Sequence, residues 1–250
     1  MYTDTEGIVF KQIKTVNGRR MIVLFSLKYG KIAAGTGSTE KGRGKSALAI
    51  RPFTYGRYEL FKNRDSYHIN SGEVLKSYYN IGEDIEKYLF ASYALEFTDR
   101  LLLEGEPVPA LFMLLKEFLQ VMELRKKRYE TIVLAYQWKT LKICGHMPNL
   151  SACAACGKKE DLRWFDVEEG GVLCDHCKES TGKNGRLIYE MGFGILDILR
   201  YFLGNPLSRL EKLALDEETQ RLVRNIVKSY MKYHLDISGL KSEEFLFYKN

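Results

Sequence analysis

The sequence predicts an α+β chain of two domains. A small β-barrel is expected over residues 1–78, and a helical domain with an inserted four-cysteine ribbon at 150–182 is expected over residues 79–250. Three observations predict this fold: short β-rich segments punctuated by turn residues, then apolar residues at helical spacing, then two Cys-x-x-Cys pairs within the helical part. A chain of 250 residues with 45% hydrophobic residues can bury both cores.

The barrel prediction rests on five short strands. The first covers Glu6–Ile13, and Asn17-Gly18 then supplies the left-handed residue pair that a tight hairpin requires before Met21–Phe25. The other three strands are expected at Lys31–Ala34, Ala47–Phe61 and Ser66–Val74. Five such strands in about 75 residues favour a closed barrel, because closure removes exposed sheet edges.

The helical part begins near Gly82. The first helix is expected to bury a stripe through Ile85, Leu89 and Tyr93. Pro107 and Pro109 separate it from a second helix, whose apolar residues run from Leu111 to Met122. The later helices are expected at Tyr129–Cys144, which Gly145 would cap, and at Glu190–Leu203, Leu207–Leu213 and Glu217–Leu235.

Charge is unevenly distributed along the chain. The net charge of +6 divides into +8 over residues 1–76 and −2 over the rest. A basic barrel suggests a polyanionic partner, although the excess charge could equally serve solubility. The polar, acidic N-terminus lacks the features of a secretory signal, and no apolar run is long enough to span a membrane. We therefore expect a cytoplasmic protein whose cysteines stay reduced.

The cysteine pattern is the sharpest signal in the sequence. Cys153 and Cys156 form one Cys-x-x-Cys pair, Cys174 and Cys177 form another, and 17 residues separate the pairs. This spacing is typical of a zinc ribbon, in which four thiolates surround one Zn²⁺ ion tetrahedrally. Four protein ligands leave no open position for substrate, so a structural role is predicted, with redox disulfide chemistry as the main alternative.

Three nearby residues are weaker metal candidates. His176 lies between two of the cysteines and could replace one of them. His146 is more simply a loop or helix-end histidine, and Cys144 is more simply a buried thiol. We expect the four cysteines of the two pairs to suffice.

Catalytic motifs are not evident. Gly44-Lys45-Ser46 is similar to the end of a phosphate-binding P-loop, but Thr39 stands where that motif needs glycine, and Ala47–Phe53 is expected to be a strand where the motif needs a helix. The sequence has four histidines and no nucleophile-elbow motif, so nothing points to a Ser/His/Asp or Cys/His site. A binding protein is predicted, with a hydrolase of scattered active-site residues kept as an alternative.

Basic residues in the barrel are candidates for phosphate contacts. Aromatic residues lie among them and could stack unpaired bases, although alternation predicts that half of them, with Phe53 first, belong to the barrel core. The aromatic residues are Tyr29, Phe53, Tyr55 and Tyr58. The basic residues are Lys28, Lys31, Lys41, Arg43, Lys45, Arg51 and Arg57.

A second basic cluster lies at a junction between two predicted helices. It consists of Arg125, Lys126, Lys127 and Arg128. These side chains could contact DNA or an acidic partner peptide, or they could form a solvated helix end that the helix dipole favours.

Three segments together resemble the bacterial RecO family of recombination and repair proteins. They are the basic stretch Lys41–Leu48 leading to Arg51-Pro52-Phe53, the four-cysteine module after Pro148-Asn149-Leu150, and the C-terminal helix that ends at His234-Leu235 before Leu240-Lys241-Ser242. The resemblance covers most of the chain.

The resemblance implies an oligonucleotide-binding (OB) barrel, a helical domain, a zinc ribbon and no enzymatic activity. It implies a mediator of the RecFOR pathway that binds single- and double-stranded DNA and anneals complementary strands. With RecR, such proteins help load RecA onto strands coated by single-strand binding protein, whose acidic tail Arg125–Arg128 would anchor. The alternative is another zinc-ribbon protein associated with nucleic acid, such as a transcription or RNA factor.

Overall fold

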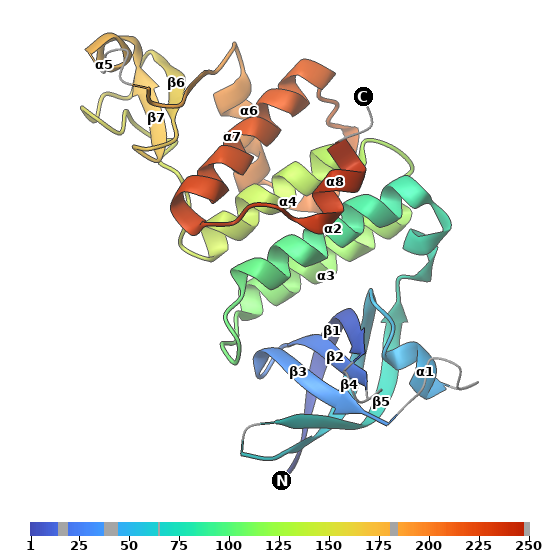
Figure 1. The fold of residues 1–250 in the computed structure, drawn as a ribbon. Helices are drawn as coiled ribbons and strands as arrows, with labels where there is room; N and C mark the ends of the chain where they lie inside the picture. The colour runs from blue at the N-terminus through green and yellow to red at the C-terminus, as the bar shows by residue number, and fades with distance from the viewer. Residues whose placement is uncertain (15–19, 38–44, 65, 181–184, 248–250) are drawn as a thin grey trace. The chain divides into compact units, whose positions relative to one another are not determined.

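The computed structural model describes residues 1–250 except for 15–19, 38–44, 65, 181–184 and 248–250 (Figure 1). The chain forms two compact units. One consists of Met1–Leu124 together with Lys241–Asn250, and the other of Arg125–Leu240. The C-terminal residues thus return to the unit that contains the N-terminus. The predicted division at 78/79 stays a prediction.

The first unit contains the predicted five-stranded closed barrel. Its strand order is β1-β2-β3-β5-β4, with β3 and β5 parallel and the other neighbours antiparallel. The barrel therefore has the predicted number of strands and is closed, as expected. The strands are β1 (Tyr2–Lys14), β2 (Arg20–Ser26), β3 (Gly30–Thr36), β4 (Thr54–Lys62) and β5 (Tyr67–Ser77).

One prediction within the barrel is wrong. Residues Lys45–Ala49 form a short helix, α1, and β4 begins only at Thr54. The Lys-Ser-Ala-Leu-Ala sequence suits a helix, and its Ala49 packs so closely that a Cβ atom at Gly72 would lie 2.9 Å from that of Ala49. The hydroxyl of Tyr58 donates to the Ala49 carbonyl at 2.6 Å, which holds the helix against the barrel core. One of the two arguments against a P-loop therefore fails, while Thr39 still departs from that motif.

Three further helices complete the first unit: α2 (Ile85–Leu101), α3 (Pro109–Leu124) and α8 (Lys241–Phe247), with a 3₁₀ turn, η1 (Tyr79–Glu83), before α2. The predicted apolar stripe of α3 is buried throughout. The stripe predicted for α2 is partly wrong, since Ile85 is 73% exposed while Phe90, Ala94 and Phe97 face the core.

The barrel is attached to these helices by aromatic packing and ion pairs. The ring of Phe112 on α3 lies 5.4 Å from Phe25 and 6.2 Å from Tyr55. Gly30, at φ +66°, allows the β2–β3 turn to approach the backbone of Glu106. A Cβ atom added at residue 30 would lie only 2.1 Å from the Glu106 carbonyl oxygen, so the approach requires glycine. The contact between the β2–β3 turn and Glu106 holds this end of the barrel against the segment before α3.

The second unit combines helices with a small sheet. It contains α4 (Tyr129–Ile143), β6 (Leu162–Asp166), β7 (Gly171–Cys174), α5 (Asp175–Ser180), β8 (Ile188–Glu190), α6 (Ile195–Gly204), the 3₁₀ turn η2 (Leu207–Lys212) and α7 (Glu217–Leu235). As predicted, Gly145 takes a positive φ after α4, and the His146 amide donates to Leu141 at 2.8 Å. The predicted helix from Glu190 instead starts at Ile195, because β8 and two glycines precede it.

The sheet of the ribbon has the order β7-β6-β8. Phe165 of β6 is fully buried, with its ring 6.4 Å from Trp138 on α4 and 6.2 Å from Tyr230 on α7. This side chain packs the ribbon against the helices of its unit. No helix among the described residues combines the length and the apolar character needed to cross a membrane.

Candidate metal centre and nucleic-acid groove

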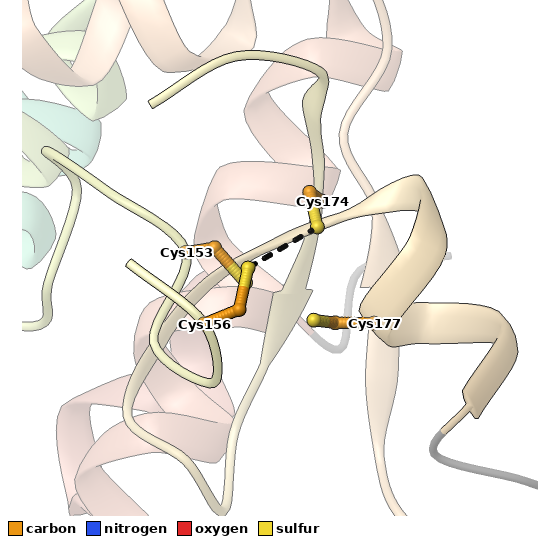
Figure 2. Close-up of side chains that lie close together, drawn as sticks. All are labelled: Cys153, Cys156, Cys174 and Cys177. Atoms are coloured by element: carbon orange, nitrogen blue, oxygen red, sulfur yellow. Dashed lines mark hydrogen bonds between the residues drawn. The ribbon is translucent and has the colours of Figure 1, made fainter. Parts of the chain in front are cut away.

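The two cysteine pairs are held by different elements of the ribbon. Cys153 and Cys156 occupy a tight loop before β6, in which Gly157, at φ +78°, donates its amide to the Cys153 carbonyl at 2.8 Å. Cys174 ends β7, and Cys177 lies one turn into α5. The Ala154 amide also donates to Val172 of β7 at 2.8 Å. This bond brings the loop against the strand, and Figure 2 shows the four thiols converging on one point.

The thiol geometry fits a tetrahedral metal. All four Sγ atoms lie within 4.8 Å of one another, and those of Cys156 and Cys174 are 3.8 Å apart. Four sulfur ligands at about 2.3 Å from one ion would themselves be separated by about 3.8 Å. The four predicted residues therefore form a candidate metal site.

Electrostatics within the cluster also favour a cation. Burial opposes ionisation of Cys153, but backbone hydrogen bonds from Cys174, Cys156 and Ala155 lower its pKa to about 6. The pKa of Cys177 is raised to about 12, first by its hydrogen bond with Cys156. One thiolate thus disfavours ionisation of a neighbouring thiol, and a bound cation would remove that repulsion.

The weaker metal candidates lie outside the cluster. Among the described residues, the group that could hold a metal consists of the four paired cysteines alone. His176 and His146 are exposed, and Cys144 is half-buried at the end of α4, where burial raises its pKa.

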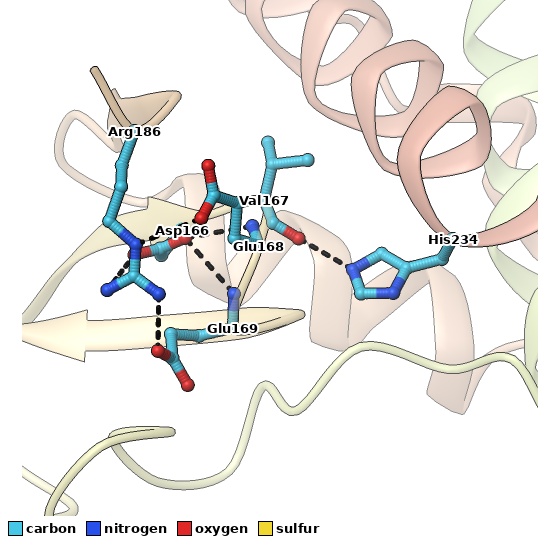
Figure 3. A network of polar contacts seen from close by, with 6 residues as sticks. All are labelled: Asp166, Val167, Glu168, Glu169, Arg186 and His234. Carbon is cyan, nitrogen blue, oxygen red and sulfur yellow. Dashed lines mark hydrogen bonds and ion pairs between the residues drawn. The ribbon is translucent and has the colours of Figure 1, made fainter. Parts of the chain in front are cut away.

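A polar network joins the ribbon strands to each other and to α7 (Figure 3). Arg186 contacts three carboxylates: Asp166 at 3.7 Å, Glu168 at 3.2 Å and Glu169 at 2.5 Å. The Asp166 carboxylate also accepts the amides of Glu168 and Glu169, so it shapes the β6–β7 turn. His234 of α7 bonds the Val167 carbonyl at 2.6 Å. The network adds contacts to the ribbon that do not involve the thiols.

A basic groove of about 960 Å³ follows the seam between β3 and β5 of the barrel. The seam is short, since only Ala34–Thr36 pair with Tyr67–Ile69. Of its four basic side chains, Lys31 is paired with Asp99, and the other three oppose the single carboxylate of Glu104 along the walls, so the groove favours an anionic ligand. The polar and aromatic side chains lining the groove are Arg20, Lys31, Thr36, Lys62, Asn63, Arg64, Ser66, Tyr67, His68 and Glu104.

An aromatic pair lies beside this groove. The rings of Tyr29 and Tyr67 are 5.5 Å apart, and the Lys62 ammonium lies 5.3 Å from the first ring and 5.4 Å from the second. The Tyr29 hydroxyl is 2.6 Å from the Thr3 hydroxyl, and this bond lowers the pKa of Tyr29. Both rings are half-buried, whereas Phe53, Tyr55 and Tyr58 are buried.

The basic residues named from the sequence occupy different places. Lys31 lines the groove, where its ammonium bonds the Asp99 carbonyl at 2.6 Å and lies 3.4 Å from the Asp99 carboxylate. Lys28, Arg51 and Arg57 are exposed, with Lys28 bonded to Thr3 and Arg57 3.9 Å from Glu73. Lys41 and Arg43 lie outside the described residues, as does the side chain of Lys45.

Sequence reasoning missed most of the groove. Arg20, Lys62, Arg64, Tyr67 and His68 belong to three separate strands or their ends, and only the parallel β3–β5 pairing brings them together. In the sequence, the two basic residues Lys62 and Arg64 before a turn were the one indication of this basic groove. The strand order is needed to show that they lie near Arg20.

The second basic cluster divides in two. Lys126, Lys127 and Arg128 are exposed, whereas Arg125 is only 6% exposed. The Arg125 Nε donates to the carbonyls of Lys127 and Arg128 at 2.8 and 3.1 Å. Arg125 therefore shapes the turn before α4, while its three neighbours form the surface.

A closed barrel with a basic groove, a helical part and a four-thiol ribbon together define a barrel-and-ribbon class of protein whose groove suits an anionic ligand. Residues 1–78 match the family described as recombination protein O N terminal, and residues 82–244 match recombination protein O C terminal. The chain belongs to the RecO family of DNA repair proteins.

Relatives match along nearly their whole length. A DNA repair protein RecO from Caldanaerobacter subterraneus is 29% identical over 98% of this chain and 97% of its own. Proteins of the same name from a Thermoanaerobacter species and from Bacillus cytotoxicus are 29% and 28% identical, over 97% and 98% of this chain and 96% and 97% of their own. Both parts of the chain therefore match the same relatives. This favours a DNA repair protein over a transcription or RNA factor.

Proposed function

We propose that this protein is a non-enzymatic recombination mediator that binds single- and double-stranded DNA, anneals complementary strands at the nucleoid and, with RecR, helps load RecA onto strands coated by single-strand binding protein. The observation that carries the proposal is the basic groove in the barrel of a RecO-family chain. The barrel, residues 1–78, would supply the nucleic-acid-binding domain.

The groove would act by neutralising phosphates. A strand lying along the seam would contact Arg20, Lys31, Lys62 and Arg64 and release its counterions. Lower charge on the bound strand weakens its repulsion of a complementary strand, which favours annealing. The predicted residues Lys28, Arg51 and Arg57, with Lys41, Arg43 and Lys45, would extend this basic surface.

The metal of the ribbon would be Zn²⁺ in a structural role. Four thiolate ligands are typical of closed zinc sites, and such sites leave no position for a reacting water or substrate. The ion would hold the loop of Cys153 and Cys156 against Cys174 and Cys177. Its contribution would be to local folding.

The exposed cluster of Lys126, Lys127 and Arg128 is proposed to anchor the acidic tail of single-strand binding protein. Three cations on one turn would attract such a tail at long range and raise its association rate. Arg125 would contribute indirectly, because its hydrogen bonds fix the backbone of that turn.

A salt titration of single-stranded DNA binding tests the groove. The log–log slope should be about −0.7 for each phosphate contact, so Lys62→Glu with Arg64→Glu should lower its magnitude by about 1.4 and weaken binding. The matched control is Lys212→Glu with Lys232→Glu, which makes the same charge change at exposed sites of the other unit. Absent or salt-insensitive binding by the wild-type protein would refute the DNA-binding proposal.

An annealing assay on coated complementary strands tests the mediator role. The protein should accelerate annealing of strands covered by intact single-strand binding protein, and less so when the acidic tail is deleted. Lys126→Glu with Lys127→Glu should reproduce the effect of tail deletion. Equal rates with and without the tail would remove this partner from the proposal.

A further inference from the structure

Two tyrosines lie side by side at one edge of the barrel core. Tyr29 lies in the β2–β3 turn and Tyr67 begins β5, and their rings are 5.5 Å apart at an angle of 44°. Both rings pack against the core, yet both residues are only half-buried, whereas Tyr58 is fully buried. Half-exposed tyrosines are common on protein surfaces and do not by themselves mark a site. The way these two rings are held, and the charge beside them, point to a ligand.

Both rings are held in place by the barrel itself. The Tyr29 amide donates to the Ser26 hydroxyl at 2.9 Å, and the Tyr29 hydroxyl is 2.6 Å from the Thr3 hydroxyl. Tyr67 pairs with β3 on one side and with β4 on the other, so two strands fix its backbone. Little conformational freedom would therefore be lost when a ligand covers these rings.

Both rings lie against a cation of the basic groove. The Lys62 ammonium lies 5.3 Å from the centre of the Tyr29 ring and 5.4 Å from that of Tyr67. Lys62 and Tyr67 both line the groove, so the pair of rings lies at its edge. An exposed ammonium gains little from an aromatic ring, and a stacked base gains more. A base can therefore take the place of the ammonium on the rings, while basic side chains of the groove contact the neighbouring phosphates.

We propose that Tyr29 and Tyr67 form a stacking site for an unpaired base of a DNA strand bound in the groove. The inference rests on the proposed DNA binding and adds to it a preference for single strands over duplexes. Within a duplex, neighbouring base pairs cover both faces of each base, so an internal base cannot reach the rings without unpairing. Phosphates are accessible in both forms of DNA, so the charges of the groove alone do not distinguish the two forms.

An abasic strand tests the stacking site, because it has the same phosphates as a natural strand of equal length and no bases. At one salt concentration, the wild-type protein should bind the natural strand at least about tenfold more tightly, as expected for one stacked base. Tyr67→Leu and Tyr29→Leu each remove a ring but keep an apolar side chain on the core. Each should lower the ratio of the two affinities severalfold, whereas Tyr67→Phe, which keeps the ring, should preserve the ratio.

Tyr79→Leu is the matched control, because Tyr79 is 65% exposed in η1 of the same unit and is not among the residues that line the groove. Thermal melting establishes that each variant is folded, and the two leucine variants lie on different elements. Equal, salt-sensitive binding of both strands by the wild-type protein, or an unchanged ratio in the folded leucine variants, would overturn the stacking site and leave the proposed DNA binding intact. Binding of neither strand would refute both proposals.

Duplex DNA distinguishes stacking from a purely structural role of the rings. The leucine variants should bind a long duplex as tightly as the wild-type protein does, because the phosphates of the duplex still meet the same cations. Their affinity for single strands alone should fall, so the preference of the protein for single strands should shrink. An equal loss of affinity for single strands and duplexes would mean that the rings only support the shape of the groove, and would overturn the proposal.

Discussion

The four-cysteine cluster and the basic groove lie in different units and depend on their residues in different ways. The cluster needs every one of its four thiols, because a tetrahedral site that loses one ligand loses its closed geometry. The groove collects several cations from separate strand ends, and each would contribute a similar increment by contacting one phosphate. Loss of one cysteine should therefore disrupt the whole cluster, whereas the effects of substitutions in the basic groove should add up.

Removing one thiol should have the largest effect. Cys153→Ser should abolish stoichiometric zinc and expose the amides of residues 151–180 to hydrogen exchange, since structural zinc sites contribute about 10–16 kcal/mol of apparent binding energy to local folding. Cys144→Ser is the matched control, because Cys144 lies outside the cluster and should leave the zinc content unchanged. A folded, zinc-loaded Cys153→Ser protein that has lost DNA binding would reverse the assignment of roles to the two regions.

The packing that joins the ribbon to its helices should have the next largest effect. Phe165→Ala removes the ring that contacts both Trp138 and Tyr230, and should cost about 3–5 kcal/mol of unfolding free energy. The ribbon should keep its zinc while its docking on the helices weakens, as thermal melting and zinc analysis would show. Simultaneous loss of zinc would mean that docking and metal binding form one cooperative unit.

The basic surface should respond in smaller, equal steps. Lys41→Glu with Arg43→Glu should weaken single-stranded DNA binding by a factor comparable to that of the Lys62 and Arg64 pair, with nearly unchanged thermal stability. The four substitutions together should multiply the two effects. Equal binding by Lys41→Glu with Arg43→Glu would exclude this stretch from the DNA surface.

The difference between the regions also explains what the sequence could predict. Cys153 to Cys177 carry their geometry in local spacing, so the cluster was predictable residue by residue. The five-strand barrel followed from turns and alternation. The groove was not predictable, because Lys62 and Arg64 meet Arg20 only through the parallel β3–β5 seam. Likewise, α1 was mistaken for a strand because a short continuous apolar run such as Ala47–Ile50 does not distinguish a helix from a strand.

The smallest expected effect on stability concerns α8, the C-terminal helix that belongs to the first unit. Glu96 of α2 accepts the amides of Lys241 and Ser242 at 3.0 and 2.9 Å, and the Ser242 hydroxyl at 2.6 Å, so its carboxylate caps α8. Burial alone would raise the pKa of Glu96, but these hydrogen bonds from Ser242 and Lys241 lower it. The stabilisation should therefore be present above the ordinary carboxyl pKa and be lost as the pH falls through the lowered one.

Glu96→Gln should destabilise the first unit by only about 1 kcal/mol, because the site is partly open to solvent. The loss should appear at neutral pH and shrink in acid, where the wild-type carboxyl is itself protonated. Thermal melting of both proteins between neutral and acidic pH measures the difference, with DNA affinity as the internal control. A constant difference at every pH would show that the carboxylate charge does not hold α8, and that packing against α2 does.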